Sequence, residues 1–504
     1  MTEGGEAAPS GPVDPSAGTA GPIRWRWLPV LAVAAIKVVL SVAVSARYGW
    51  HRDELYYLAS AHHLELGYVD FPPVTPLVAG LVQVIAPDSL VALRFSSILA
   101  GALVAVLAAL IARDLGGRGA AQVLAALSVV ISPVYLLADF IFGTDAFDQL
   151  AWALLLWIVV RILAGGDRRL WLLAGLALGA GLETKYTISA LAIALAAGLL
   201  LTPARRLLAT RWPWLGVALA VALFLPNVWW QLGHGWISVA YTLQHRGNTD
   251  GPVAYWLEQV LTVQPVLLPV AVAGGVWLWR SGRFRSMAWA AILVELLFFI
   301  SNGKSYYPAA VYPVLYAAGM VWVERAFGSR LLRSVLVVAA TAVTLVLLPI
   351  ELPVLPAGSF ARSGLWREQP DFAEMYGWPS MVHQVEGAYG SLPASERGGA
   401  TILASNYGEA GALDLYAKAG QLPPVVSPHL TYYYWAPARM DPQVVIAVGY
   451  PRQDLDRLFG SVTRVGTIRN SYGIQNDEEG NPIFVCRSPR RPLWREWPSL
   501  KDLN

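Results

Sequence analysis

The sequence predicts a polytopic, all-α membrane protein that carries a small α/β domain at its C-terminal end. Of its 504 residues, 56% are hydrophobic and only 14% are charged, whereas soluble domains carry roughly 25% charged residues. Apolar segments of membrane-spanning length recur from residue 27 to residue 350. Beyond residue 350 the sequence is rich in Pro, Gly, Trp and charged residues, and short segments with the pattern of β-strands follow.

The apolar segments define about eleven transmembrane helices, because a helix needs about 20 mostly apolar residues to cross a bilayer. They lie near residues 27–46, 90–112, 119–138, 147–164, 170–183, 186–202, 213–231, 262–279, 287–301, 307–326 and 332–350. The segments at 170–183 and 186–202 are short, and an alternative is that they form one kinked element.

The basic residues decide between these alternatives. With the N-terminus in the cytoplasm, most Arg clusters between spans lie on the cytoplasmic side, as the positive-inside rule expects. Merging the short pair would place the later clusters outside, so we keep two spans. Residues 1–24, rich in Gly, Ala, Pro and Ser, then form a disordered cytoplasmic tail. Residues 25–350 form the membrane domain, and residues 351–504 form an extracytoplasmic domain.

The C-terminal domain is expected to mix strands and helices. TILASNY and QVVIAVGY read as short buried strands, with GEAGALDLYAKAG as a helix between them. SVTRVGTIR and PIFVCR read as edge strands around the loop NDEEGN. The aromatic run at residues 432–435 is either a sugar platform or, as we favour, a membrane anchor.

The first outer loop, residues 47–89, contains more charged and aromatic residues than a simple connection between two helices requires. Its residues 48–76 place acids and bases among aromatic residues and end in a Pro72–Pro73 stop. The charged residues include Arg52, Asp53, Glu54 and Asp70. Charged groups near a bilayer are costly and mark functional sites. The alternative is an amphipathic helix in the headgroup layer.

Lysine is scarce, and Lys185 and Lys304 both lie at outer span ends beside tyrosines. Two ammonium groups with tyrosine hydroxyls suit a lipid-linked phosphate, and the alternative is interfacial anchoring by Lys and Tyr. Lys185 has a second alternative role as an ion-pair partner of Glu183. Lys37 stands in the middle of the first span, where it either pairs with an acid on a neighbouring helix or snorkels.

Acidic and basic residues that gather on the same predicted outer face of the membrane indicate an enzyme that transfers a chemical group. A carboxylate can take the proton of an acceptor hydroxyl, and a leaving phosphate needs cations. The sequence has no Gly-rich phosphate loop at a strand end, which argues against a soluble nucleotide as direct donor. A net charge of +3 is too small to indicate nucleic acid as a partner.

Several segments together resemble a known family. HRDELYYLASAHHLELGYVDFPPVTPL, TDAFDQLAW, TKYT and GKSYYPAAVYPVLYAAG resemble the polytopic glycosyltransferases of GT-C fold that use a lipid-phosphate-sugar donor. This group includes protein O-mannosyltransferases and the lipid A aminoarabinose transferase. The resemblance covers most of residues 25–350, and NYGEAGALDLY extends it into the C-terminal domain.

The resemblance implies roles for the acidic residues of the outer loops. Asp53 matches the family's first-loop acid, the base that activates the acceptor, with Glu54 as the alternative. Asp145 matches the second-loop acid, with Asp148 as the alternative.

It also implies a phosphate site and a metal site. The donor phosphate would be held by Lys304, Tyr306 and Tyr307, with Lys185 and Arg52 nearby. Asp70 stands where aminoarabinose-transferase-like members place a metal-ligand acid, and His245 is its candidate partner. Phe71 replaces a Lys of those members, so one phosphate contact is missing. One Asp and one His are fewer ligands than zinc sites use, so a divalent metal is allowed but no cofactor is required.

The sequence therefore predicts a membrane glycosyltransferase, hexosyl- or pentosyl-transferring. It would move a sugar from a polyprenyl-phosphate donor to a hydroxyl acceptor (protein, lipid or glycan) on the outer face, with inversion. The alternative is a transporter or flippase of a lipid-linked sugar. Transporters usually carry charge near the bilayer midplane in two related halves, whereas here the charges lie at the outer span ends and no halves repeat.

Overall fold

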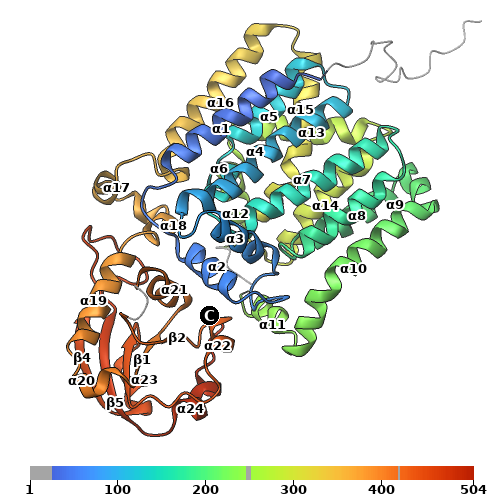
Figure 1. Cartoon of the computed structure of the whole chain (residues 1–504). Coiled ribbons are helices and arrows are strands. Elements are labelled where there is room, and N and C mark those ends of the chain that lie inside the picture. Colours follow the sequence, from blue (N-terminus) through green and yellow to red (C-terminus); the bar gives the residue numbers. More distant parts are fainter. Residues whose placement is uncertain (1–24, 246–250, 418–420) are drawn as a thin grey trace, which may run out of the picture.

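The computed structural model describes residues 25–245, 251–417 and 421–504, and the expected tail at residues 1–24 lies outside these ranges. A helical bundle fills most of Figure 1, and the C-terminal domain, coloured orange to red, packs against one end of it. The bundle contains α1 (Trp27–Val44), α2 (Arg52–His62), α3 (Val74–Ile85), α4 (Leu90–Asp114), α5 (Gly119–Ile131), α6 (Pro133–Phe140), α7 (Thr144–Leu163), α8 (Leu170–Leu182), α9 (Ile188–Leu200), η1 (Pro203–Ala209), α10 (Arg211–Gly233), α11 (Ile237–Gln244), α12 (Pro252–Val263), α13 (Leu268–Arg280), α14 (Arg285–Ile300), η2 (Tyr307–Val311), α15 (Tyr312–Ala326) and α16 (Arg330–Glu351).

The bundle has the helices of a polytopic membrane protein. Among the described residues, five helices (α1, α4, α7, α10 and α16) are long and apolar enough to cross a bilayer, and up to eight spans result if each bent helix pair counts as one. Every predicted span overlaps helical residues. The predicted number of about eleven spans stays a prediction, because several of the helices are shorter than the roughly 20 residues that a straight crossing requires.

Two predicted spans are broken where proline interrupts the helix. The span at 119–138 bends by 61° between α5 and α6, where Pro133 begins the second helix. The span at 262–279 was predicted with the wrong start, because α12 ends at Val263 and α13 begins at Leu268, with a bend of 98°. Pro265 lies in this break, and a proline ring removes a backbone donor and clashes with the preceding turn.

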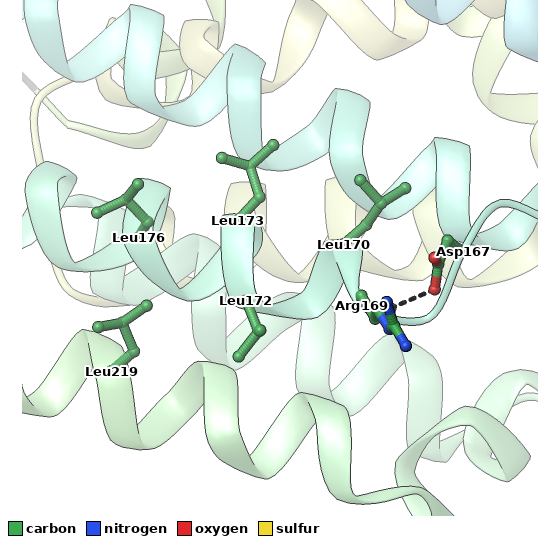
Figure 2. Close-up of a pocket in the computed structure, with 7 residues that line it drawn as sticks. All are labelled: Asp167, Arg169, Leu170, Leu172, Leu173, Leu176 and Leu219. Atoms are coloured by element: carbon green, nitrogen blue, oxygen red, sulfur yellow. Dashed lines mark hydrogen bonds between the residues drawn. The ribbon is translucent and has the colours of Figure 1, made fainter.

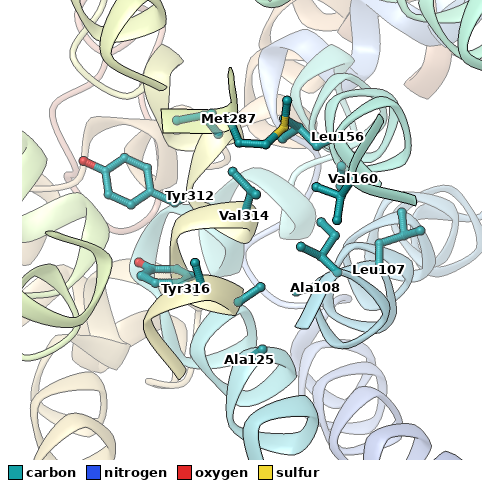
Figure 3. Close-up of a cluster of buried hydrophobic side chains, with 14 of the residues drawn as sticks. Leu107, Ala108, Ala125, Leu156, Val160, Met287, Tyr312, Val314 and Tyr316 are labelled. Atoms are coloured by element: carbon teal, nitrogen blue, oxygen red, sulfur yellow. The ribbon is translucent and has the colours of Figure 1, made fainter. Parts of the chain in front are cut away.

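The core of the bundle is built from close helix packing. Figure 3 shows part of the largest buried apolar cluster of the described residues, to which α4, α7 and α15 contribute Leu107, Leu156 and Val314. Small residues allow the closest approaches, as expected for helices in lipid. A Cβ added to Gly175 of α8 would lie 2.1 Å from the carbonyl oxygen of Gly216 on α10, so these two backbones are in contact.

Lys37 has a partner inside the bundle, which confirms the first of the two predicted alternatives. Its ammonium lies 2.9 Å from Oδ2 of Asp139 on α6 and donates to the carbonyl of Tyr135 at 2.8 Å. Both charged side chains are buried. A charge in hydrocarbon is tolerated when it is paired in this way, so the ion pair fixes α1 against α6.

The C-terminal region begins with short helices and ends in a sheet. Its elements are α17 (Ala357–Ser363), η3 (Leu365–Arg367), α18 (Pro370–Ala373), α19 (Trp378–Gly390), α20 (Ala394–Arg397), β1 (Ala400–Ala404), α21 (Tyr407–Tyr416), β2 (Val425–Val426), α22 (Tyr432–Trp435), β3 (Val444–Val448), α23 (Arg452–Leu458), β4 (Phe459–Thr467), β5 (Pro482–Pro489) and α24 (Leu493–Leu500). The strand order is β2-β1-β3-β5-β4, with β1, β2 and β3 parallel and β5 antiparallel to both of its neighbours.

The expected strands are present, and the expected helix between the first two is α21, whereas residues 418–420 of that prediction lie outside the described ranges. The segment PIFVCR was predicted as an edge strand, but β5 lies between β3 and β4, and of these two predicted edge strands only β4 is at an edge of the sheet. Residues 483–486 are buried without a break, which is the pattern of a strand covered on both faces. In the aromatic run at 432–435, Tyr432 is buried in the cluster that α2 shares with the sheet domain and the other three residues are half-buried, so the role of the run stays a prediction.

The C-terminal domain packs against residues 47–89, the predicted first outer loop, through α2 and α21, which lie next to each other in Figure 1. The hydroxyl of Tyr56 on α2 lies 2.7 Å from Oγ1 of Thr431 and accepts the Thr431 amide at 3.0 Å. Trp378 Nε1 donates to the carbonyl of Trp50 at 3.1 Å. Tyr56 and the residues around it are buried, so the first outer loop forms part of a shared core with the domain.

Candidate active site

Asp53 is placed by the N-terminal cap of α2. The ring of His51 accepts the amide of Asp53 at 3.2 Å, and Glu54 reaches back to accept the amide of His51 at 2.8 Å. This reciprocal capping box satisfies two helix-terminal donors. Asp53 therefore stands in the first helical turn, where the helix dipole favours a carboxylate. Its side chain remains 45% exposed, so it is open to a ligand.

Asp53, Asp145 and Lys304 line one cavity of about 480 Å³, together with Tyr306. The four residues come from α2, α7 and the connection before η2, which are far apart in sequence. Acids and a cation thus meet beside apolar side chains such as Leu137, Ile141 and Leu347. A cavity of this size with a few convergent polar groups fits the description of a small-ligand site.

Lys185 lies beside this cavity and is paired with Asp145. Its ammonium is 2.5 Å from Oδ1 of Asp145 and lies 4.8 Å from the ring centre of Tyr307 and 5.9 Å from that of Tyr306. The alternative pairing of Lys185 with Glu183 is absent, and both carboxylate oxygens of Glu183 are buried without a hydrogen-bond partner among the described residues.

Lys304 is the cavity cation that the described structure leaves without an ion pair. It is exposed, and its ammonium lies 5.7 Å from the ring centre of Tyr306. An unpaired ammonium at a cavity wall can meet a phosphate without first breaking another contact.

Glu54 lies outside this cavity although it follows Asp53 in the sequence. It is fully buried and forms a two-point ion pair with Arg94 of α4, at 2.7 and 2.8 Å. Its oxygens also accept the amides of His51 and Phe142. A carboxylate with all of these donors has no oxygen available for a substrate proton, which fits a structural role.

Asp148 and Arg52 also do not line the cavity. Asp148 is buried and accepts from Trp152 Nε1 at 3.0 Å and from the Thr187 hydroxyl at 2.6 Å. Arg52 lies 2.5 Å from Asp477 and 3.8 Å from Glu374, both in the C-terminal region. The predicted site residues thus divide into a group at the cavity and a group that holds the surrounding elements together.

The metal site predicted at Asp70 and His245 stays a prediction, and each of the two side chains has another partner in the structure. The Tyr56 hydroxyl donates to Asp70 at 3.1 Å, while His245 contacts the carbonyl and ring of Tyr241. Burial raises the pKa of Asp70 to about 7, more than the Tyr56 hydrogen bond lowers it. In the described ranges no three or more His, Cys, Asp or Glu residues are grouped as metal ligands.

The structure adds cavity residues that sequence reasoning missed. Glu258, Ser305, Glu351 and Asp371 line the cavity, and Ser305 donates to Glu258 at 2.5 Å. Glu258 carried a signal, since it is an acid within the apolar run AYWLEQVL, but the predicted span began only at residue 262. Glu351 and Asp371 follow the last predicted span, in a region read as loops.

A second pocket, shown in Figure 2, has a different character. Its wall is mainly leucine from α8, with Leu219 from α10, and the polar residues Asp167 and Arg169 lie at one end. The only hydrogen bond drawn there runs from the Arg169 amide to Asp167, at 2.8 Å. An apolar groove on the outside of a membrane bundle is suited to lipid chains. Its lining does not combine acidic and basic side chains around a cavity as the first pocket does.

Comparisons with known proteins agree with the fold. Residues 70–230 match the family model described as dolichyl-phosphate-mannose-protein mannosyltransferase. The lipid A galacturonosyltransferase RgtD from Rhizobium johnstonii is 27% identical over 290 residues, which is 53% of this chain and 59% of RgtD. The match therefore spans less than two thirds of that relative.

Two solved structures show the same architecture over nearly the whole chain. The crystal structure of ArnT from Cupriavidus metallidurans in the apo state has a TM-score of 0.60 at 17% identity, covering 90% of this chain and 97% of ArnT. ArnT bound to undecaprenyl phosphate gives a TM-score of 0.55 at 16% identity over the same shares of the two chains. The shared fold and the matching segment confirm the resemblance that the sequence predicted: this chain has the GT-C architecture of the polytopic glycosyltransferases.

Proposed function

We propose that this protein is a membrane glycosyltransferase that moves a sugar from a polyprenyl-phosphate donor to a hydroxyl group of a lipid or glycan acceptor on the outer face of the membrane. The observation that carries the proposal is the single cavity lined by Asp53, Asp145 and Lys304. The names of RgtD and of undecaprenyl-phosphate-bound ArnT support the donor and acceptor classes.

In the proposed mechanism, Asp53 is the general base. Its carboxylate takes the proton of the acceptor hydroxyl as that oxygen attacks the anomeric carbon of the sugar. A new carbon–oxygen bond forms while the bond from the same carbon to the phosphate oxygen breaks, and the bonding electrons leave with the lipid phosphate. Attack opposite the leaving group inverts the configuration of the sugar carbon.

Lys304 is proposed to hold the leaving phosphate, with the hydroxyl of Tyr306 beside it. The ammonium is exposed, and the described residues provide no ion pair for it. Lys185 would stabilise the phosphate less directly, because Asp145 already occupies it at 2.5 Å. A positive charge held near the oxygen that gains negative charge lowers the transition-state free energy.

The test of the function is a transfer assay with purified protein in vesicles and a radiolabelled polyprenyl-phosphate sugar. We expect label to appear on a hydroxyl-bearing acceptor together with release of the free lipid phosphate. Label that crosses the vesicle membrane while still attached to its lipid would instead support the flippase alternative, which neither the cavity nor the comparisons favour.

Replacing Lys304 with Met is expected to weaken donor binding and turnover together. The variant keeps the length of the side chain but removes the charge, so we expect kcat/KM for the donor to fall by about 10–100-fold, the range of one charged hydrogen bond. Lys501 provides the control, because it is a lysine beside tyrosines in the C-terminal domain, 2.7 Å from the Tyr434 hydroxyl, and Lys501→Met should leave kcat/KM unchanged. Equal kinetics of Lys304→Met and the unmodified protein would contradict the assignment.

A further inference from the structure

The C-terminal domain contributes a direct contact to the carboxylate of Asp53. The hydroxyl of Tyr407, in the first turn of α21, donates to Oδ1 of Asp53 at 2.6 Å. The two residues are 354 positions apart in the sequence. Oδ2 of Asp53 has no hydrogen-bond donor among the described residues and lies 3.9 Å from Nδ1 of His51. The two oxygens of this carboxylate are therefore in different environments.

The ring of Tyr407 is held in place on several sides. It stacks on Tyr56 of α2, with ring centres 4.7 Å apart, and on His429, with ring centres 5.1 Å apart. The guanidinium of Arg52 lies 4.9 Å from its ring centre. Its backbone amide donates to Nδ1 of His429 at 3.2 Å. A hydroxyl carried by a ring with these neighbours can point in few directions, so it fixes the oxygen that it touches.

Tyr407 remains a donor across the range of pH in which enzymes work. Burial and the negative charge of Asp53 raise its pKa well above the ordinary value of a tyrosine. A neutral hydroxyl that donates to a carboxylate forms a charge-assisted hydrogen bond, which is shorter and stronger than one between neutral groups. This contact therefore orients the carboxylate and does not compete for the proton that the carboxylate receives.

We propose that Tyr407 is a positioning residue of the transfer reaction: it holds Oδ1 of Asp53, so that Oδ2 faces the cavity and takes the proton of the acceptor hydroxyl. The inference rests on the proposed function and extends it, because it makes the C-terminal domain part of the catalytic unit. In this step the proton moves from the acceptor oxygen to Oδ2, the acceptor oxygen bonds to the sugar carbon, and the lipid phosphate leaves with the electrons of the broken bond.

The test is the variant Tyr407→Phe, which removes the hydroxyl and keeps the stacked ring. We expect kcat to fall by about tenfold or more, the usual range for a hydrogen bond to a charged group, while KM for the polyprenyl-phosphate sugar and the thermal midpoint stay the same. Tyr450→Phe is the matched control. It removes another hydroxyl of the same domain, which donates to the carbonyl of Ala404 at 3.3 Å, and should leave kcat unchanged.

Two results would overturn the inference. One is an unchanged kcat for Tyr407→Phe, which would show that Asp53 needs no orientation from this domain. The other is a fall in kcat in both Phe variants together with an equal loss of thermal stability in both. That result would mean that the two hydroxyls only stabilise the docking of the domain. The proposed function fails separately: it falls if the unmodified protein transfers no sugar from the polyprenyl-phosphate donor, whereas an inactive Asp53→Asn beside a fully active Tyr407→Phe rejects only the role of Tyr407.

Discussion

Replacing Asp53 with Asn is expected to lower kcat for sugar transfer by about 10²–10⁴-fold, the contribution that a positioned general base makes. Asparagine has nearly the same shape, and its amide oxygen can still accept the Tyr407 hydroxyl that now lies 2.6 Å from Oδ1. It cannot take a proton from the acceptor. The variant should therefore fold, insert and bind donor like the unmodified protein, with the loss confined to turnover.

The measurement is single-turnover transfer with saturating donor, together with binding of the donor lipid and a thermal unfolding curve. Asp88→Asn is the control, since Asp88 is an exposed acid of the same outer loop and should have no effect on any of the three. Transfer at the unmodified rate by Asp53→Asn would remove the general base from the mechanism. The proposal would then need another acid of the cavity, of which Asp145 is the first to test.

Much of the fold could be predicted because its signals are local. Long apolar runs must be helical in a bilayer, since every backbone group has to be paired there, and the predicted spans all overlap helices. The breaks were harder to place. Pro133 begins a new helix without interrupting the apolar run, and the break after Val263 lies inside a segment that hydropathy alone reads as continuous.

The candidate site could be predicted in part for a similar reason. Asp53, Asp145 and Lys304 attract notice because each is a charge beside aromatic residues at a span end, and the structure brings them to one cavity. Sequence could not separate Asp53 from Glu54, because the difference depends on Arg94, which is 40 residues away. Nor could it find Tyr407, whose contact exists only once the C-terminal domain has docked on α2.

Glu54 is expected to show the opposite behaviour to its neighbour, with its largest effect on stability. Glu54→Gln removes the charge that balances Arg94, and both side chains are fully buried. Breaking one partner of a buried ion pair leaves the other uncompensated, which typically costs about 3–5 kcal/mol. Arg94 also donates to the carbonyls of Ser45 and Gly49. Loss of the Glu54 charge should therefore destabilise the end of α1 as well as α2. We therefore expect a lower thermal midpoint and poor yield of folded protein.

Asp53→Asn and Glu54→Gln make the same chemical change, carboxylate to amide, at adjacent positions. Comparing them distinguishes a catalytic carboxylate from a structural one. The protein that does fold with Glu54→Gln should retain measurable transfer per folded molecule, because the cavity carboxylate of Asp53 is intact. The double variant Glu54→Gln with Arg94→Met should regain part of the lost stability, since it removes the charge that the single variant leaves buried and unpaired. A Glu54→Gln variant as stable as the unmodified protein but without transfer activity would reverse the two assignments and make Glu54 the base.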